Sequence, residues 1–229
     1  IAVAAGTHSS PYTVAEHTWA LILAATRRTP EEVGLMKRGA WRSAFSLSLR
    51  GRTLGILGLG QIGSLVAAPA PTFGMRVLVW GREATRERAQ RAGYAVATSQ
   101  RALFEESDVL SINLRLLPET RGSVTADDLA AMKPDSVLVN AARAELIAPG
   151  ALEQAVRQGR PGMGAVDVYG NGPVLHGDHP LLRLDNAICT PHSAWLEKET
   201  YESYLGEAFE NAAAFAAGQQ VKLLNPEVR

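Results

Sequence analysis

Three glycines at the end of an apolar run could bind a phosphate group. They have the spacing G-x-G-x-x-G and are Gly58, Gly60 and Gly63. In this pattern the first glycine makes a tight turn, the second lets the backbone approach a pyrophosphate, and the third lets a helix pack against the preceding strand. The free N–H groups at Gln61 and Ile62 would then face the phosphates. The pattern predicts a dinucleotide-binding turn; a glycine-rich turn without a ligand is the alternative.

The end of the next apolar run, residues 76–80, should select the dinucleotide. An acidic residue about 20 positions after the glycines binds the ribose 2′-hydroxyl of NAD, whereas an arginine accommodates the 2′-phosphate of NADP. Here Gly81 and Arg82 follow the run, with Arg86 one helical turn further on. The absent carboxylate favours NADP over NAD. An ordinary solvated helix face over residues 82–91 explains the same arginines equally well.

Three further polar residues, Arg143, Asp167 and His192, each lie at or just after the end of a short apolar run. If these runs are strands of one open parallel sheet, their carboxyl ends share an edge, and ligands collect at such edges. We therefore expect the three residues to converge on one crevice.

Apolar runs that predict strands alternate with stretches of helical periodicity. Strands are predicted at residues 1–3, 53–57, 76–80, 94–97, 108–113, 136–140, 164–168 and 187–189. Helices are predicted at residues 13–28, 30–37, 83–92, 100–106, 126–132, 150–158 and 197–218. A further helix after Gly63 meets Pro69 and Pro71, where it must kink or stop. The alternation predicts an α/β fold with a doubly wound parallel sheet.

Composition restricts the partners and the compartment. The chain has 229 residues, 46% of them hydrophobic, and 23 basic residues balance 23 acidic ones. This balance disfavours nucleic acid and anionic membranes as partners. The apolar runs are too short to cross a bilayer, and no leader pattern is visible. The single Cys189 excludes an intramolecular disulfide, so we expect a cytoplasmic protein.

Over nearly its full length the chain resembles the D-isomer-specific 2-hydroxyacid dehydrogenases. The motifs that carry the resemblance are Val-Ala-Glu-His at 14–17, Arg-Gly-Arg-Thr-Leu-Gly at 50–55, Gly-Leu-Gly-Gln-Ile-Gly at 58–63, Phe-Gly-Met at 73–75, Glu-Thr-Arg-Gly at 119–122, Met-Lys-Pro at 132–134, Asn-Ala-Ala-Arg at 140–143, Gly-Ala-Val-Asp-Val at 164–168, Asp-Asn at 185–186 and Thr-Pro-His at 190–192. The resemblance implies a Rossmann-type domain, a homodimer, and an oxidoreductase that moves hydride between NAD or NADP and a 2-keto acid or D-2-hydroxy acid.

The resemblance also implies roles for the three polar residues. Arg143 would hold the carboxylate and keto oxygen of the substrate, and Asp167 would bind the nicotinamide end of the cofactor. His192 would be the acid/base that exchanges a proton with the keto oxygen. These roles suit the side chains, because arginine offers a planar fork to a carboxylate and histidine titrates near neutral pH.

Some positions depart from the family pattern. The family's glutamate that pairs with the catalytic histidine is replaced by Gly172, so His192 is expected to hold its proton less tightly. Asp178 or a water molecule could take that place. Ala144 replaces the usual glycine after the arginine, and residues 115–117 replace a Pro-Leu-Thr; Arg115 could touch the cofactor or face solvent.

The resemblance divides the chain into two regions. Residues 1–195 would form the dinucleotide-binding domain, within which residues 11–45 would be an arm for dimerisation. Residues 196–229 would be a helix and tail that belong to a substrate-binding domain otherwise absent from this sequence. On pattern alone, His17 and Trp19 in the arm are packing residues.

Two other functions share parts of the pattern. A dinucleotide-sensing protein of the corepressor type, without turnover, is favoured by Gly172 and disfavoured by Arg143 and His192. A methyltransferase could use a similar glycine turn, but the three polar residues argue against it. His176 and His179 flank Asp178 without further close ligands, so no metal site is predicted.

Overall fold

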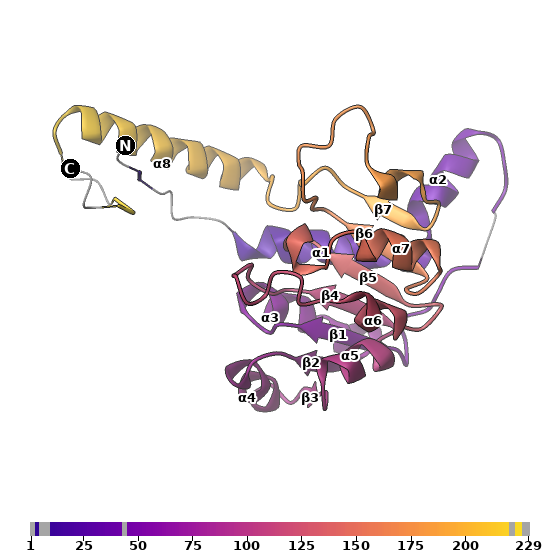
Figure 1. Cartoon of the computed structure of the whole chain (residues 1–229). Helices are drawn as coiled ribbons and strands as arrows, with labels where there is room; N and C mark the ends of the chain where they lie inside the picture. The colour runs from indigo at the N-terminus through magenta and orange to yellow at the C-terminus, as the bar shows by residue number, and fades with distance from the viewer. Residues whose placement is uncertain (1–2, 5–9, 43–44, 220–222, 226–229) are drawn as a thin grey trace.

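A seven-stranded parallel sheet organises the chain (Figure 1), and its strand order is β3-β2-β1-β4-β5-β6-β7. The computed structural model describes residues 3–4, 10–42, 45–219 and 223–225. The strands are β1 (Thr53–Leu57), β2 (Arg76–Trp80), β3 (Ala95–Val96), β4 (Val109–Ile112), β5 (Val137–Asn140), β6 (Met163–Val166) and β7 (Ala187–Cys189). Every residue of β1, β4 and β5 is buried, as expected for central strands covered on both faces. The predicted doubly wound sheet is confirmed.

Helices cover both faces of the sheet. They are α1 (Pro11–Arg27), α2 (Thr29–Lys37), α3 (Gln61–Ala67), α4 (Glu83–Arg91), α5 (Gln100–Glu106), α6 (Ala126–Ala130), α7 (Ala151–Arg157) and α8 (Lys198–Ala216). From β1 the chain adds strands first in one direction (β2, β3) and then in the other (β4 to β7). Because the crossovers are right-handed, the helices of the two halves lie on opposite faces of the sheet. Accordingly, buried residues of α3 and α4 share one apolar cluster, and those of α5, α6 and α7 share the other.

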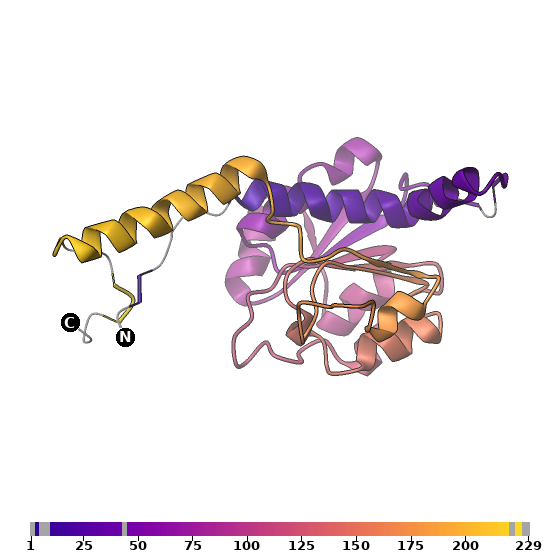
Figure 2. The same cartoon turned by 90° about the horizontal axis from the view of Figure 1, so that it is seen from above.

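Helix α1 covers the rest of the sheet face on which α3 and α4 lie. It precedes β1 in the chain, yet it packs beside α3 and across β5 and β6 (Figure 2). Trp19 is buried there, and its indole N–H donates to the Val66 carbonyl at 3.0 Å. Its ring stacks on Phe73 with 4.9 Å between centroids. Trp19 is therefore a packing residue, which was one of its two predicted roles.

Prolines end the helix that follows the glycine turn, as predicted. Helix α3 stops at Ala67, and the 3-10 helix η1 (Ala70–Phe73) follows with Pro71 inside it. Strand β3 is shorter than the predicted 94–97. Two further 3-10 helices, η2 (Ala144–Leu146) and η3 (Pro180–Arg183), were not predicted, because single turns lack a readable period. The strand predicted at 1–3 falls mainly outside the described residues.

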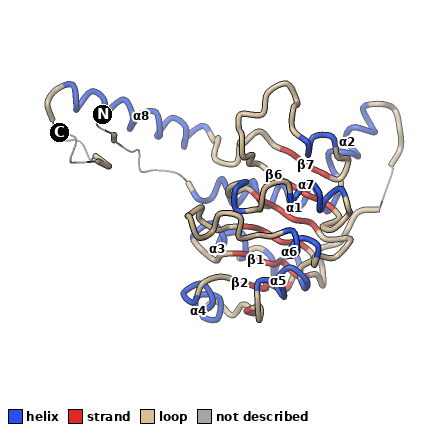
Figure 3. Tube along the Cα trace, in the orientation of Figure 1, coloured by secondary structure: helices blue, strands red, loops and turns tan. Residues whose placement is uncertain are grey.

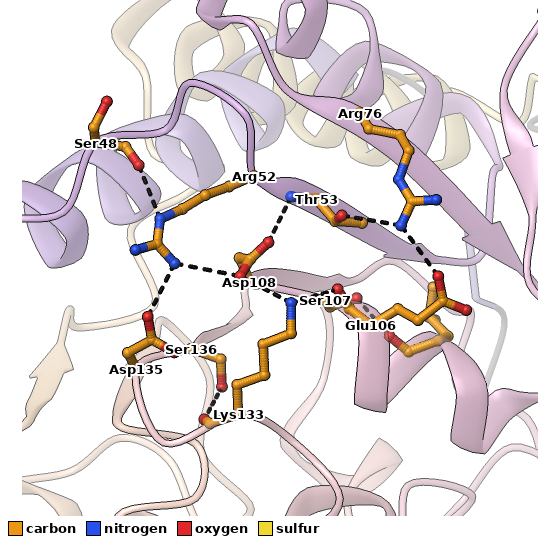
Figure 4. A network of polar contacts seen from close by, with 11 residues as sticks. Ser48, Arg52, Thr53, Arg76, Glu106, Ser107, Asp108, Lys133, Asp135 and Ser136 are labelled. Atoms are coloured by element: carbon orange, nitrogen blue, oxygen red, sulfur yellow. Dashed lines mark hydrogen bonds and ion pairs between the residues drawn. The ribbon is translucent and has the colours of Figure 1, made fainter.

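An ion-pair network closes the amino-terminal edge of the sheet (Figure 4). Asp108 accepts the Thr53 backbone N–H at 2.7 Å, Lys133 Nζ at 2.9 Å and Arg52 Nη1 at 3.3 Å. Arg52 also pairs with Asp135 at 3.0 Å. Burial raises the pKa of Asp108, but these donors outweigh it and hold that pKa below its usual value. The network ties together the starts of β1, β4 and β5.

Two helices project from the sheet (Figure 3), and neither contains a buried residue. Helix α2 and the segment after it expose Val33, Met36, Trp41 and Phe45. Helix α8 leads away from β7 and exposes Tyr201, Tyr204, Leu205, Phe209 and Phe215. In the part of the chain that the structure describes, no helix is long and apolar enough to span a membrane.

Candidate active site

The glycine turn has the geometry that its spacing predicts. Gly58 has φ 94°, and its N–H donates to the Trp80 carbonyl at 2.9 Å, which joins the ends of β1 and β2. A Cβ on Gly63 would lie 2.2 Å from the Gly58 carbonyl oxygen, so only glycine lets α3 pack this closely. Around Gly60, the N-cap of α3, a Cβ would meet nothing within 4 Å. The turn therefore offers an open approach to the first amides of α3, which fits a pyrophosphate.

Three arginines after the end of β2 each contact a partner. Arg82, the N-cap of α4, pairs with Glu119 from the loop after β4 at 2.7 Å. The Glu119 pKa is lowered by a hydrogen bond from its own backbone N–H and by Arg82. The Arg86 guanidinium lies 5.4 Å from the centre of the Trp80 ring. Arg88 donates to the Leu59 carbonyl in the glycine turn. These arginines thus contact the body of the domain, although Arg82 and Glu119 both remain largely solvent-exposed.

Arg143 is held by a buried amide at the end of β5. The Asn140 side chain accepts the Ala142 N–H at 3.0 Å and donates to the Arg143 carbonyl at 2.9 Å. This clamp shapes the turn before η2 and leaves the Arg143 side chain exposed. One of its nitrogens, Nη1, donates to the Ala142 carbonyl at 2.6 Å. A guanidinium has five donors, so it retains the capacity to bind a carboxylate.

Asp167 is fully buried at the end of β6, and its carboxylate binds the loop after β7. One oxygen, Oδ1, accepts the Thr190 hydroxyl at 2.5 Å and the Ser193 N–H at 2.9 Å. The other, Oδ2, accepts the Ala194 N–H at 2.9 Å. Burial raises the pKa of Asp167, but hydrogen bonds from His17, Thr190 and the two amides outweigh it and lower that pKa. Its expected contact with the nicotinamide stays a prediction.

His192 lies in the loop that Asp167 binds. Its φ is 55°, which is uncommon for a residue other than glycine, and its N–H donates to the Thr190 carbonyl at 3.0 Å. The side chain is exposed. Because β5, β6 and β7 are neighbours in the sheet, Arg143, Asp167 and His192 follow adjacent strand ends, as the sequence predicts.

The loop from 170 to 179 contains the position of the family's missing carboxylate. A Cβ on Gly172 would meet only the Tyr169 carbonyl oxygen, at 3.9 Å, so the position has room for a side chain. Asp178, a predicted substitute, pairs instead with Arg183 at 3.4 Å. His179 accepts the Leu181 N–H through Nδ1 at 3.3 Å and so caps η3. Among the described residues, no cluster of three or more histidine, cysteine or acidic side chains could hold a metal ion.

The sequence singled out the motif at residues 14–17, but on pattern alone His17 was expected to be a packing residue, so its polar contacts were not predicted. His17 of α1 places Nε2 3.0 Å from the Thr190 hydroxyl and 3.4 Å from Asp167 Oδ1. His17 directly precedes the buried Thr18 and Trp19, which indicated that it lies near the core. A sequence pattern cannot show that its partners lie 150 or more residues later in the chain. Glu119 and Arg88 were missed for the same reason.

Comparison with known proteins identifies similar chains. The family model described as "D-isomer specific 2-hydroxyacid dehydrogenase, NAD binding domain" matches residues 19–194. A glyoxylate reductase from Aeropyrum pernix is 40% identical over an alignment of 224 residues, and the match covers 93% of this chain and 66% of that protein. A D-3-phosphoglycerate dehydrogenase from Methanocaldococcus jannaschii is 34% identical over 222 residues, 96% of this chain and 40% of that protein. The chain thus spans less than two thirds of the length of each of these relatives.

A solved structure shows the same arrangement of elements. A crystal structure of an oxidoreductase from Ralstonia solanacearum superposes with a TM-score of 0.93 at 47% sequence identity. The match covers 99% of this chain and 69% of the other. At this coverage the match includes α8 as well as the sheet.

Proposed function

Because the chain belongs to the D-isomer-specific 2-hydroxyacid dehydrogenase family, we propose that it carries the cofactor-binding and acid/base machinery of an oxidoreductase. The reaction would interconvert a 2-keto acid and a D-2-hydroxy acid with a nicotinamide dinucleotide as hydride carrier. The single observation that carries the proposal is the placement of Arg143 and His192. Both side chains are exposed, and they follow strands on either side of β6, at the sheet edge that also holds the glycine turn.

The residues at this edge divide the work of the reaction. Arg143 binds the substrate carboxylate and orients the keto group, with its backbone fixed by Asn140. His192 donates a proton to the keto oxygen during reduction and recovers one from the hydroxyl during oxidation. When bound, a reduced nicotinamide would supply the hydride: its C–H bond would break as the new C–H bond forms at the carbonyl carbon, and the C=O π electrons would take the proton from His192 to form the hydroxyl.

The residues present fit a nicotinamide dinucleotide. The open space at Gly60, with Gln61, Ile62 and Gly63 opening α3, would hold the pyrophosphate. At the end of β2, Gly81 and Arg82 would lie beside the adenosine ribose. We favour NADP over NAD because Gly81 stands at the strand end where a carboxylate is expected for NAD, and Arg82 and Arg86 follow it. Glu119 would have to release Arg82 for a 2′-phosphate.

We also propose a homodimer and a small-molecule substrate of the family type. Residues 11–27 of the arm pack on the sheet of their own chain, so the dimer contact would come from residues 29–45. Support comes from the exposed Val33, Met36 and Trp41, and none of the described residues between 29 and 45 is buried. The exposed aromatic face of α8 would pack against a substrate-binding unit.

Titration tests the cofactor part of the proposal. NADPH and NADH are added to the chain while tryptophan fluorescence is followed, and the Arg82→Ala variant is titrated in parallel. We expect quenching at micromolar dinucleotide, with NADPH binding weakened more than NADH binding in the variant. The absence of binding at micromolar concentrations would contradict the proposal.

A panel of 2-keto acids then tests turnover and the second candidate function. A dinucleotide-sensing interaction protein is favoured by one observation, the glycine at position 172 where the family carries a carboxylate. Oxidation of NADPH with any 2-keto acid supports the dehydrogenase. Tight dinucleotide binding without turnover on the whole panel would support the sensing protein instead.

A further inference from the structure

His17 joins α1 to the two strand ends that carry the site. Its imidazole Nε2 lies within reach of both Thr190 Oγ1 and Asp167 Oδ1, and its side chain is 21% exposed, against 0% for Asp167. The Thr190 hydroxyl gives its proton to Asp167 at 2.5 Å, so its lone pairs are left to accept. A proton on His17 Nε2 satisfies this arrangement, because both nearby atoms are then acceptors.

The carboxylate that His17 approaches holds the backbone on both sides of His192. Thr190 lies two residues before His192 and binds Asp167 through its hydroxyl, while Ser193 and Ala194 follow and bind through their amides. His192 itself has a left-handed backbone, which persists in a residue other than glycine only when its surroundings fix it. The Asp167 carboxylate is therefore the anchor of the His192 loop.

We propose that His17 is a positioning residue that fixes the His192 loop through Thr190 and Asp167. Its effect on catalysis rests on the proposed function, whereas its effect on the loop does not. The link spans 173 residues of sequence between His17 and Thr190. Helix α1 thereby contributes to the site without touching substrate or cofactor.

Helix α1 does not need the imidazole to stay in place. Ala15, Trp19 and Ile22 bury its inner face in the core, and Trp19 adds the bond to Val66. Substitution of His17 should therefore leave α1 packed, and it removes one donor from a buried carboxylate cluster. His17→Gln keeps an N–H donor at the end of a side chain of similar reach, whereas His17→Ala removes it.

Amide hydrogen exchange of the full chain tests the effect on the loop. We expect exchange at Ser193 and Ala194 to become about tenfold faster in His17→Ala and to return towards the wild-type rate in His17→Gln. Glu16→Gln, an exposed neighbour on α1, is the matched control and should leave these rates unchanged. Unchanged rates in His17→Ala, or equal acceleration in the alanine and glutamine variants, would overturn the proposal.

Thr190→Val provides a second variant, should His17→Ala fail to fold. It removes the hydroxyl between His17 and Asp167 with little change in volume, and the proposal requires the same faster exchange at Ser193 and Ala194. Wild-type exchange in Thr190→Val would overturn the link. These measurements need no substrate, so they remain decisive if the chain shows no turnover.

Where the chain turns over a 2-keto acid, kinetics tests the effect on catalysis. We expect kcat to fall roughly 10²-fold in His17→Ala, the loss typical of a misplaced reacting group, with KM for the keto acid changed less than about threefold. His17→Gln should recover most of kcat. A kcat within about twofold of wild type in His17→Ala would contradict the positioning role.

Discussion

The two edges of the sheet at which the strands begin and end both carry polar side chains. At the first edge these side chains are paired with one another, and at the second they are exposed. At the amino-terminal edge the two cations Arg52 and Lys133 pair with the carboxylates of Asp108 and Asp135, and the Thr53 amide also donates to Asp108. At the carboxyl-terminal edge Arg143 and His192 extend into solvent, held by backbone bonds alongside them. The first arrangement uses its charges to fix strands, whereas the second leaves an arginine and a histidine side chain exposed, as our proposal of ligand binding requires.

The motifs that carry the family resemblance serve different roles at the two edges. The motif at 50–55 and the one at 132–134 supply Arg52, Thr53 and Lys133 to the amino-terminal network, far along each strand from the candidate site. The motifs at 140–143 and 190–192 supply the exposed arginine and histidine. Some family motifs therefore stabilise the fold and others supply side chains to the candidate site. The contacts of each residue show to which group it belongs.

Substitution at the carboxyl-terminal edge should give the largest effect. We expect His192→Ala to lower kcat roughly 10²–10⁴-fold, because the proposed proton donor is lost. Its free energy of unfolding should stay within about 0.5 kcal/mol of wild type, since the side chain is exposed. Steady-state kinetics and urea unfolding of the same preparation measure both. A stability loss that accounts for the lost activity would contradict the division between the edges.

Substitution at the amino-terminal edge should lower stability and leave dinucleotide binding unchanged. Asp108→Ala leaves two cations and the Thr53 amide without their shared acceptor, so we expect a loss of about 2 kcal/mol in unfolding free energy. Dinucleotide affinity should be unchanged below the unfolding transition. Arg101→Ala, which removes an exposed ion pair with Glu105, serves as the control and should cost less than about 1 kcal/mol.

The pH dependence of the unfolding free energy should reveal the contribution of Asp108 in the same network. The pKa of Asp108 is lowered in the folded state, so the carboxylate contributes stability above its ordinary pKa of about 3.9 and loses it as pH falls through the folded value. Urea unfolding between pH 6 and pH 2 should therefore show a fall below about pH 4. Asp108→Asn should show a shallower fall, with part of the slope remaining from Asp167, whose pKa is also lowered. An identical slope in the variant would exclude Asp108 as a source.

The smallest expected effect comes from restoring the family's carboxylate. Gly172→Glu adds a side chain where a Cβ meets nothing closer than 3.9 Å, so stability should be unaffected. If the carboxylate reaches His192, reduction should stay active to higher pH, because the protonated histidine is favoured. The pH dependence of kcat for wild type and variant measures this. Gly170→Glu, two residues earlier and equally open, is the matched control.

The fold was largely predictable, because buried strands and the glycine turn leave local signals. The predicted strand ends at Arg143, Asp167 and His192 do share an edge, since parallel topology follows from the alternation of helices and strands. The contacts of His17 and Glu119 were not predictable. Each depends on partners distant in sequence, at 167, 190 and 82, which only packing brings together. The correspondence of Gly172 with the family's carboxylate stays a prediction, and the pairing of Asp178 with Arg183 required coordinates.

The division between the two edges is tested most directly by mapping hydrogen exchange with and without saturating NADPH. We expect protection at residues 58–63, at 81–83 and at 190–194, where the carboxyl-terminal edge would contact the dinucleotide. Residues 52–53 and 133–136 of the amino-terminal network should show no change. Protection confined to the amino-terminal edge, or none at the glycine turn, would show that the dinucleotide does not bind where we propose.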